Sequence, residues 1–340
     1  MIRDSAILDA ERRTASLHVA VIIPCYNAGP WIARTVKSVL AQSHRPLTVV
    51  AVDDGSSDDT LERLEGFGDA IHVETGPNCG ACHARNRGFD LAMEAGASHV
   101  IFLDADDYFE GELVAGMASI ALRTGADLVL GNMHLEYPGP AGQPALREQR
   151  FLYSGRIRPE DFLMGWMTGA YVNPSALLWK AELVRAIGGW DEELWRAQDL
   201  DFALRAMFEL PRIEKSEAGA AIYSRLNENS ISRQLSERAQ QSRFRASARL
   251  LERATSPGME RFAAVAPHFL GELYLIRVEC LRDGYTALAA EIGALLRAHG
   301  WRRHVGTPAH RVAATILGVE RKVALVGAMR RLRRSLRRQS

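Results

Sequence analysis

The first two thirds of the chain alternate short apolar runs with longer segments of helical character. β-Branched runs at residues 19–23, 48–52 and 98–103 predict buried strands, and the segments 30–41 and 80–95 predict helices. Strands that alternate with helices are typical of an α/β fold with a mainly parallel central sheet and helices on both of its faces.

The alternation continues with shorter signals as far as residue 224. The pattern predicts strands at 71–73, 127–130, 175–179 and 220–224, and helices from residue 60 and at 111–124, 181–187 and 200–208. Residues 137–142 are typical of a flexible loop, and the surrounding segment 131–168 carries no further signal.

Strand signals stop near residue 235, and only helical patterns follow. These predict helices at 237–254, 258–281, 287–299 and 311–338. We therefore divide the chain into an N-terminal extension (1–17), an α/β domain (18–235) and an all-helical C-terminal region (236–340).

The composition is that of an ordinary globular protein, with 47% apolar and 24% charged residues among 340. The net charge of +1 hides an asymmetry, because residues 301–340 hold eleven Arg or Lys and one acid, Glu320, a local balance of +10. The remaining 300 residues therefore carry 1 − 10 = −9. The basic end is a separate electrostatic unit.

Apolar residues recur every three or four positions from Val312 to Val326, ahead of an arginine-rich end. Such a basic amphipathic helix over 311–340 favours binding to an anionic membrane surface. The alternatives are docking on the acidic α/β domain, a partner or a second copy held through the C-terminal helices, and nucleic acid. Nucleic acid is the least favoured, because no nucleic-acid-binding fold accompanies the helix.

The sequence predicts a cytoplasmic protein, peripheral on the inner face of the membrane if its basic end binds lipid. No apolar run approaches the roughly 18 to 20 residues of a membrane span, and residues 1–13 lack the apolar core of a signal peptide. Four cysteines are too few for a disulfide scaffold. In the single CxxC, Cys79 and Cys82, we favour ordinary thiols over a zinc or redox pair.

Three acids, Asp104, Asp106 and Asp107, follow the apolar run 98–103; we call residues 104–107 the acid loop. Their charges repel one another and raise one another's pKa unless a cation is bound. Oxygen ligands suit Mg²⁺ or Mn²⁺. Taken alone, the cluster is equally well explained as a solvated turn that caps the helix starting near residue 110. Similar polar clusters end the two strands before it, at the edge where open α/β sheets bind ligands.

An ordered series of motifs resembles the family 2 glycosyltransferases, enzymes of GT-A fold, over about residues 18–232. The series reads Val21-Ile22-Ile23-Pro24-Cys25-Tyr26-Asn27, Val52-Asp53-Asp54-Gly55-Ser56-Ser57-Asp58, Asn78 through Ala84-Arg85-Asn86-Arg87-Gly88, Leu103-Asp104-Ala105-Asp106-Asp107, Gly188-Gly189-Trp190-Asp191-Glu192 and Gln198-Asp199-Leu200-Asp201. Each motif is weak by itself, but six in order are specific.

The resemblance implies a nucleotide sugar, commonly UDP-linked, lying across the strand ends. Pro24, Tyr26 and Asn27 would line the nucleotide, with Tyr26 stacked on the base. Asp54 would accept a hydrogen bond from a uracil ring nitrogen. Arg85 would bind phosphate, or, as an alternative, hold its helix against the acid loop.

The resemblance also implies the roles in catalysis. Asp106 would be the central metal ligand, Asp104 would reach the ribose or the metal, and Asp107 would assist. Asp199 would be the base of a one-step inverting displacement, or a helix cap. The residue before it is usually Glu in the family, and here it is Gln198.

The segment just before the base resembles the family's loop beside the acceptor. Trp190 and Asp191 would therefore bind the acceptor, with Trp190 stacked on a sugar ring. Buried core aromatics are an equally common use of such residues. Trp195 is a weaker candidate of the same kind.

These observations predict an inverting, metal-dependent glycosyltransferase that acts on a carbohydrate or lipid-linked acceptor in cell-surface polysaccharide or glycolipid synthesis. The alternative is a non-catalytic nucleotide-sugar or carbohydrate binding protein of the same fold, with Gln198 as a sign of lost chemistry. A dehydrogenase is disfavoured, because no glycine-rich dinucleotide fingerprint follows any strand.

Overall fold

The computed structural model describes residues 17–139, 146–150, 153–226, 236–302, 304, 314–315 and 318–326. The chain forms two compact units. The first runs to Glu192 and resumes at Gln198, and the second comprises residues 193–197 and the described residues from 236 onward. The predicted basic helix at 311–338 lies largely outside the described residues. Within this range, the described residues 314–315 and 319–326 are helical.

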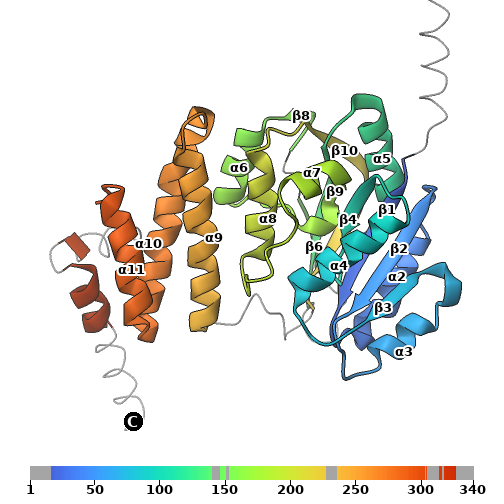
Figure 1. The fold of residues 1–340 in the computed structure, drawn as a ribbon, viewed down its shortest axis with the longest axis horizontal. Coiled ribbons are helices and arrows are strands. Elements are labelled where there is room, and N and C mark those ends of the chain that lie inside the picture. The colour runs from blue at the N-terminus through green and yellow to red at the C-terminus, as the bar shows by residue number, and fades with distance from the viewer. Residues whose placement is uncertain are drawn as a thin grey trace, which may run out of the picture. The chain divides into compact units, whose positions relative to one another are not determined.

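The first unit is built on a ten-stranded mixed sheet of order β3-β2-β1-β4-β9-β6-β10-β5, with β7 paired to β6 and β8 to β10 (Figure 1). The strands are β1 (Val19–Cys25), β2 (Leu47–Asp53), β3 (His72–Thr75), β4 (His99–Phe102), β5 (Tyr108–Glu110), β6 (Leu128–Tyr137), β7 (Leu146–Arg150), β8 (Arg156–Ile157), β9 (Leu177–Lys180) and β10 (Ile213–Ser224). The interleaved helices are α2 (Gly29–Leu40), α3 (Thr60–Glu65), α4 (Ala81–Glu94), α5 (Leu113–Thr124), α6 (Pro159–Met167), α7 (Ala181–Ala186) and α8 (Gln198–Met207). This architecture confirms the predicted α/β fold.

Strand direction gives the sheet one functional edge. The strands β3, β2, β1 and β4 are mutually parallel. The next strand, β9, runs antiparallel to both β4 and β6, so β6 again points the same way as β4. Because β10 is parallel to β6, the carboxyl ends of β1, β2, β4, β6 and β10 all lie at the same edge.

The core of this unit is the apolar β1 and β4 with helix α4 packed closely on β1 and β2. Val19, Ile22 and Ile101 are fully buried. The close approach of α4 depends on Gly88, because a Cβ atom there would lie 2.4 Å from Cγ2 of Ile22. Any larger side chain would push α4 away from the sheet.

The segment 131–168, which carries no sequence signal, contains most of β6 together with β7, β8 and α6. Outside this segment, β10 extends over twelve residues and is longer than predicted, and β5 was not predicted. Buried residues fill most of β6, so the strand lacks the alternation of a half-exposed strand. β7 and β8 are short edge strands, for which periodicity is a weak guide.

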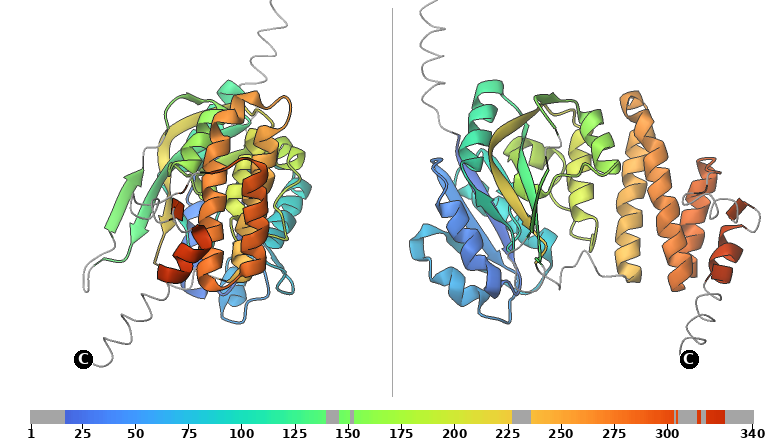
Figure 2. Two further views of the ribbon diagram at one scale, coloured as in Figure 1. Left: turned by 90° about the vertical axis from the view of Figure 1, so that its left-hand side faces the viewer. Right: turned by 180° about the vertical axis from the view of Figure 1, so that it is seen from behind.

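The described part of the second unit includes the helices α9 (Glu237–Thr255), α10 (Ala266–Asp283) and α11 (Thr286–Ala298), and α10 packs against both of the others (Figure 2). The Ser236 hydroxyl caps α9 by accepting a hydrogen bond of 3.2 Å from the Ala239 amide. A short 3₁₀ helix, Glu260–Val265, replaces the first part of the predicted helix 258–281. No helix among the described residues is long and apolar enough to cross a membrane.

Candidate functional site

The polar clusters meet at the shared carboxyl edge of the sheet. The loop after β1 is tied to the loop after β2, because the Asn27 side-chain oxygen accepts a 2.8 Å hydrogen bond from the Ser57 amide. The Ser56 hydroxyl in turn accepts a 2.9 Å bond from the Asn27 amide. Tyr26 is 53% exposed and is therefore accessible to a planar ligand, whereas Pro24 lies within β1.

The two acids after β2 hold the chain that follows. Asp54 is buried, and its carboxylate accepts hydrogen bonds of 2.7 and 2.9 Å from the amides of Cys79 and Gly80. Asp53 accepts a 3.0 Å bond from the Thr75 hydroxyl. Each Asp54 oxygen keeps a second lone pair for a ligand donor. Cys79 and Cys82 are free thiols, and burial raises the pKa of Cys82 to about 12.

The acid loop does not present three carboxylates to one point. Asp107 is fully buried; its oxygens accept bonds of 2.9 Å from the Ser224 amide and 3.4 Å from the Ser175 hydroxyl. Burial, and then the charges of Asp104 and Asp106, raise its pKa well above the ordinary range. Within the described residues, no three His, Cys, Asp or Glu side chains are grouped to hold a metal ion. The expected third ligand, Asp107, is thus placed in the core.

Asp104 and Asp106 remain at the edge, and both are partly exposed. Mg²⁺ is commonly held by one or two carboxylates together with substrate phosphates and water. These two side chains therefore fit a metal that a diphosphate helps to bind.

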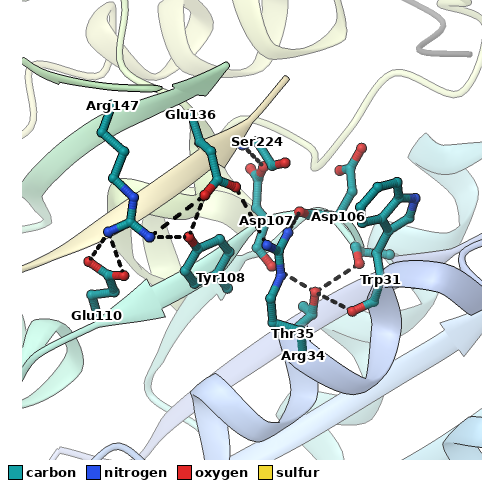
Figure 3. Close-up of polar contacts among 11 residues, drawn as sticks. Trp31, Arg34, Thr35, Asp106, Asp107, Tyr108, Glu110, Glu136, Arg147 and Ser224 are labelled. Atoms are coloured by element: carbon teal, nitrogen blue, oxygen red, sulfur yellow. Dashed lines mark hydrogen bonds and ion pairs between the residues drawn. The ribbon is translucent and has the colours of Figure 1, made fainter. Parts of the chain in front are cut away.

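The backbone of the acid loop is held by helix α2 (Figure 3). The Thr35 hydroxyl lies 2.8 Å from the Ala105 carbonyl and 2.7 Å from the Asp107 carbonyl, and its one proton serves one of them at a time. Arg34 donates a 3.1 Å bond to the Asp106 carbonyl. These contacts hold the loop through its main-chain carbonyls.

Arg34 is itself oriented by a buried acid on β6. The Glu136 carboxylate lies 3.5 Å from the Arg34 guanidinium and accepts a 3.0 Å bond from the Tyr108 hydroxyl (Figure 3). Burial and the bond to Glu136 raise the pKa of Tyr108 to about 12. No motif in the sequence pointed to Arg34, Thr35 or Glu136, because their partners lie 70 to 102 residues away along the chain.

Arg85 on α4 connects the acid loop to the start of α8. Its guanidinium donates a 2.7 Å bond to Asp104 and a 3.2 Å bond to the side-chain oxygen of Gln198. Burial opposes its charge, but Asp104 and Asp199 outweigh that effect and raise the pKa of Arg85. Arg85 therefore holds its helix against the acid loop, as the alternative interpretation expected. It also carries a permanent positive charge between Asp104 and Asp199.

Asp199 lies in the first turn of α8, which begins one residue earlier at Gln198. Burial, and then the charge of Asp104, raise the pKa of Asp199 to about 6, while Arg85 acts in the opposite direction. A carboxylate with a pKa near neutrality is suited to taking a proton. Ala197, just before the helix, has φ of 62°, a left-handed conformation that is unusual for alanine.

The loop at residues 188–192 is clamped from both sides. From α4, the Asn86 side chain donates a 2.9 Å bond to the Trp190 carbonyl and accepts a 2.8 Å bond from the Trp190 amide. From α8, Arg205 donates a 2.7 Å bond to the Gly189 carbonyl and pairs with buried Asp201 at 2.7 Å. Asn86 and Asp201, which both belong to the motif series, thus have a structural role in holding this loop.

Trp190 is a core residue and not an exposed platform. It is 2% exposed, it stacks on Phe202 with ring centroids 4.0 Å apart and an interplanar angle of 3°, and it contacts the edge of Phe102. The Arg85 guanidinium lies over the Trp190 ring, 4.5 Å from the ring centroid. The structure corrects the expected stacking of Trp190 on an acceptor sugar. Asp191 is partly exposed beside it.

The sheet, its polar edge and its acid loop form the fold of the GT-A glycosyltransferases. Residues 20–172 match the family model described as glycosyl transferase family 2, so this part of the chain belongs to that family. The resemblance in the motif series is thereby confirmed.

Relatives with curated descriptions are also glycosyltransferases. The glycosyltransferase EpsJ of Bacillus subtilis is 27% identical over 223 residues, 63% of this chain and 62% of its own length. GlyG of Streptococcus pneumoniae is 27% identical over 122 residues, 34% of this chain and 39% of its own. The chain thus spans less than two thirds of the length of these relatives.

Solved structures share the fold at low identity. Staphylococcus aureus TarS 1–349 in complex with UDP-GlcNAc has a TM-score of 0.58 and 18% identity, and the match covers 85% of this chain and 95% of TarS 1–349. The mannosyltransferase PcManGT of Pyrobaculum calidifontis, in complex with GDP-Man and Mn²⁺, has a TM-score of 0.52 and 17% identity, covering 94% and 88% of the two chains.

Proposed function

We propose that this chain is an inverting glycosyltransferase that moves a sugar from a UDP-linked donor to an acceptor hydroxyl. The observation that carries the proposal is the bridge made by Arg85, which bonds to Asp104 on the acid loop and to Gln198 at the start of α8. The bridge links the proposed leaving-group side of the site to the proposed base, Asp199, and a one-step displacement requires both.

The donor lies, in this proposal, along the ends of β1, β2 and β4. Tyr26 stacks on the base, Asn27 and Pro24 line the nucleotide, and Asp54 accepts the uracil N–H through its free lone pairs. The UDP-GlcNAc and GDP-Man complexes of the structural neighbours support a nucleotide-sugar ligand for this fold.

Asp106, assisted by Asp104, would hold Mg²⁺ or Mn²⁺ against the donor diphosphate. When bound, the metal neutralises charge that develops on the departing nucleoside diphosphate. Arg34 and Thr35 hold the loop through its carbonyls, which fixes the main chain that carries Asp106. Asp104 stays oriented by Arg85.

Asp199 takes the proton from the acceptor hydroxyl as that oxygen attacks the anomeric carbon. With a pKa of about 6, roughly nine tenths of the group is ionised at pH 7. The alternative, a non-catalytic binding protein, rests on the replacement of the usual Glu by Gln198. Gln198 still accepts the Arg85 hydrogen bond, so the replacement leaves the bridge intact and the alternative loses its main support.

The acceptor is a carbohydrate or lipid-linked molecule of cell-surface polysaccharide or glycolipid synthesis, and Asp191 contacts it. A cytoplasmic enzyme held at the inner membrane face by residues 311–340 would meet such acceptors at the lipid surface.

Replacement of Asp199 tests the proposal. Asp199→Asn keeps the size of the side chain and removes its basicity, so we expect turnover to fall by roughly 10² to 10⁴. The affinity for UDP, measured by calorimetry, should stay nearly unchanged. Asp90→Asn, at an exposed position of α4, is the matched control and should retain full turnover. Near-normal turnover of Asp199→Asn would remove Asp199 as the base.

A further inference from the structure

Arg225 lies at the functional edge of the sheet and, among the described residues, has no carboxylate partner. It follows β10 directly, and its guanidinium donates a 2.8 Å bond to the Tyr171 hydroxyl. Its Nε is buried and has no hydrogen-bond partner. Among the described residues, no carboxylate forms an ion pair with Arg225.

Such an arrangement is unusual, because partly buried guanidinium groups are normally paired with a carboxylate or fully hydrogen-bonded. The groups that act electrostatically on Arg225 are tyrosine hydroxyls, from Tyr171, Tyr223 and Tyr137. Tyrosines are neutral at physiological pH. The charge of Arg225 is therefore available to a ligand, and phosphate and carboxylate are the groups that a guanidinium binds best.

Aromatic rings surround this guanidinium. The Arg225 side chain lies 5.1 Å from the ring centroid of Tyr223, near the end of β10, and 5.8 Å from that of Tyr137, at the end of β6. Tyr171 comes from the segment after α6, and all three rings are partly exposed. Aromatic faces pack well against sugar rings, so the cluster combines a surface for a sugar with a charge for an anion.

The main chain ties this cluster to the acid loop. The Ser224 amide donates to the Asp107 carboxylate at 2.9 Å, and the next amide, of Arg225, donates to the Glu136 carbonyl at 2.8 Å. The backbone bonds of Ser224 and Arg225 therefore fix the main chain of Arg225 beside the acid loop. Asp107 and Asp104 also act electrostatically on Tyr223.

The order of strands separates this cluster from the proposed nucleotide residues. These residues follow β1 and β2, whereas Tyr137 and Arg225 follow β6 and β10, and the strands β4 and β9 lie between the two groups. A nucleotide sugar that places its diphosphate on the acid loop leaves the β6 and β10 side of the edge to the second substrate.

From this we infer that Arg225, with Tyr137, Tyr171 and Tyr223, binds an anionic group of the acceptor, a phosphate or a carboxylate carried close to the sugar that is glycosylated. This inference rests on the proposed function and narrows the acceptor to an anionic one. Arg225 could instead bind the diphosphate of the donor. The experiment below separates binding of an acceptor anion from binding of the donor diphosphate.

The probe is inorganic phosphate, added to the full chain with UDP and Mg²⁺ at saturating concentrations so that the diphosphate position is filled. Phosphate binding is followed by ³¹P line broadening and UDP binding by calorimetry, for the wild type and for Arg225→Gln. We expect Arg225→Gln to weaken phosphate binding by about tenfold or more, as for loss of a charge-assisted contact, and to leave the Kd of UDP within about twofold.

The matched control is Arg212→Gln, because Arg212 is an exposed arginine just before the same strand, at the opposite edge of the sheet. It should change neither affinity. A loss of UDP affinity in Arg225→Gln equal to the loss of phosphate affinity would assign Arg225 to the donor and overturn the inference. Unchanged phosphate binding would overturn it as well.

Two further readouts keep the outcomes separate. If Arg225→Gln does not fold, competition between phosphate and UDP is measured on the wild type. Simultaneous binding of phosphate and UDP supports an anion position separate from that of the donor diphosphate. Competition between phosphate and UDP for one position contradicts the inference. If UDP fails to bind the wild type, the proposed function fails. The phosphate titration without UDP then still tests Arg225 as an anion-binding residue.

Discussion

Asp199 and Asp107 show how differently two acids of one site are used at the scale of single residues. Burial raises the pKa of both. Asp107 has backbone and hydroxyl donors on its two oxygens and lies in the core, where it joins the acid loop to Ser224 and Ser175. Asp199 lies in the first turn of a helix that begins at the functional edge. The first arrangement stabilises a loop, and the second suits proton transfer.

The raised pKa of Asp199 predicts a pH dependence of catalysis. The base must be ionised, and its pKa in the folded protein, about 6, exceeds the ordinary aspartate value of 3.8. We therefore expect kcat/KM for the acceptor to be constant above about pH 7 and to fall tenfold per pH unit well below 6.

Gln198→Glu provides the check on this assignment. A second acid would compete for Arg85 and add negative charge beside Asp199, so the acidic limb should move to higher pH. A pH profile without an acidic limb near 6 in the wild type would contradict the role given to Asp199.

At the scale of elements, the site depends on loops that are held from two directions. The acid loop is bonded to α2 and, through Asp107, to the end of β10. The loop at 188–192 is bonded to α4 and α8. The helices and strands thus act as a rigid frame, and the chemical groups stand on short connections between them.

Removal of one clamp should loosen the frame measurably. Asn86→Ala deletes both hydrogen bonds to the main chain of Trp190, and we expect unfolding to be easier by about 2 kcal/mol, because polar groups of the loop lose their partners. Urea denaturation measures this change. His83→Ala is the control, since His83 contacts the same loop only through a half-exposed pair with Glu192, and it should have almost no effect. Equal stabilities of the two variants would refute the clamp.

At the scale of the whole molecule, the charge is divided between an acidic body and a basic end. Residues 1–300 carry a balance of −9 and residues 301–340 one of +10. Opposite charges favour opposite surfaces, so we expect the basic end, and not the acidic part, to favour anionic lipid.

Binding of the donor should be visible as stabilisation of the whole protein. UDP with Mg²⁺ at about 100 times its Kd adds roughly 2.7 kcal/mol, which corresponds to a rise in Tm of roughly 4 °C for a chain of this size. GDP-, CDP- and dTDP-sugars serve as comparisons. Asp106→Asn should abolish the part of the shift that depends on metal. If no nucleotide shifts the Tm, the proposed donor class is wrong.

The basic end predicts membrane association. In flotation with liposomes that contain anionic lipid, we expect the full chain to float with the vesicles and a chain that ends at residue 310 to stay behind. Salt at about 0.5 M should release the full chain, because screening weakens surface attraction. Equal flotation of the two chains would remove this function from residues 311–340.

Local patterns along the chain were sufficient for the α/β fold and for the motif series, because strand and helix signals and turn chemistry act over a few residues. Asp104 and Asp106 at a strand end, and Asp199 at the start of a helix, were accessible to sequence reasoning for this reason. The extent of β6 and β10 and the presence of α6 were not, since buried strands lose their alternation.

The tertiary structure alone decided how the side chains share the site. The sequence determined which acids, aromatics and strand ends were available, but Asp107 is buried by Ser175 and Ser224, 68 and 117 residues later. Trp190 is buried by stacking on Phe202, and Arg225 lies beside Tyr137 only because β10 pairs with β6 in parallel. Contacts between distant residues depend on the packing of the sheet and its helices, which leaves no local trace in the sequence.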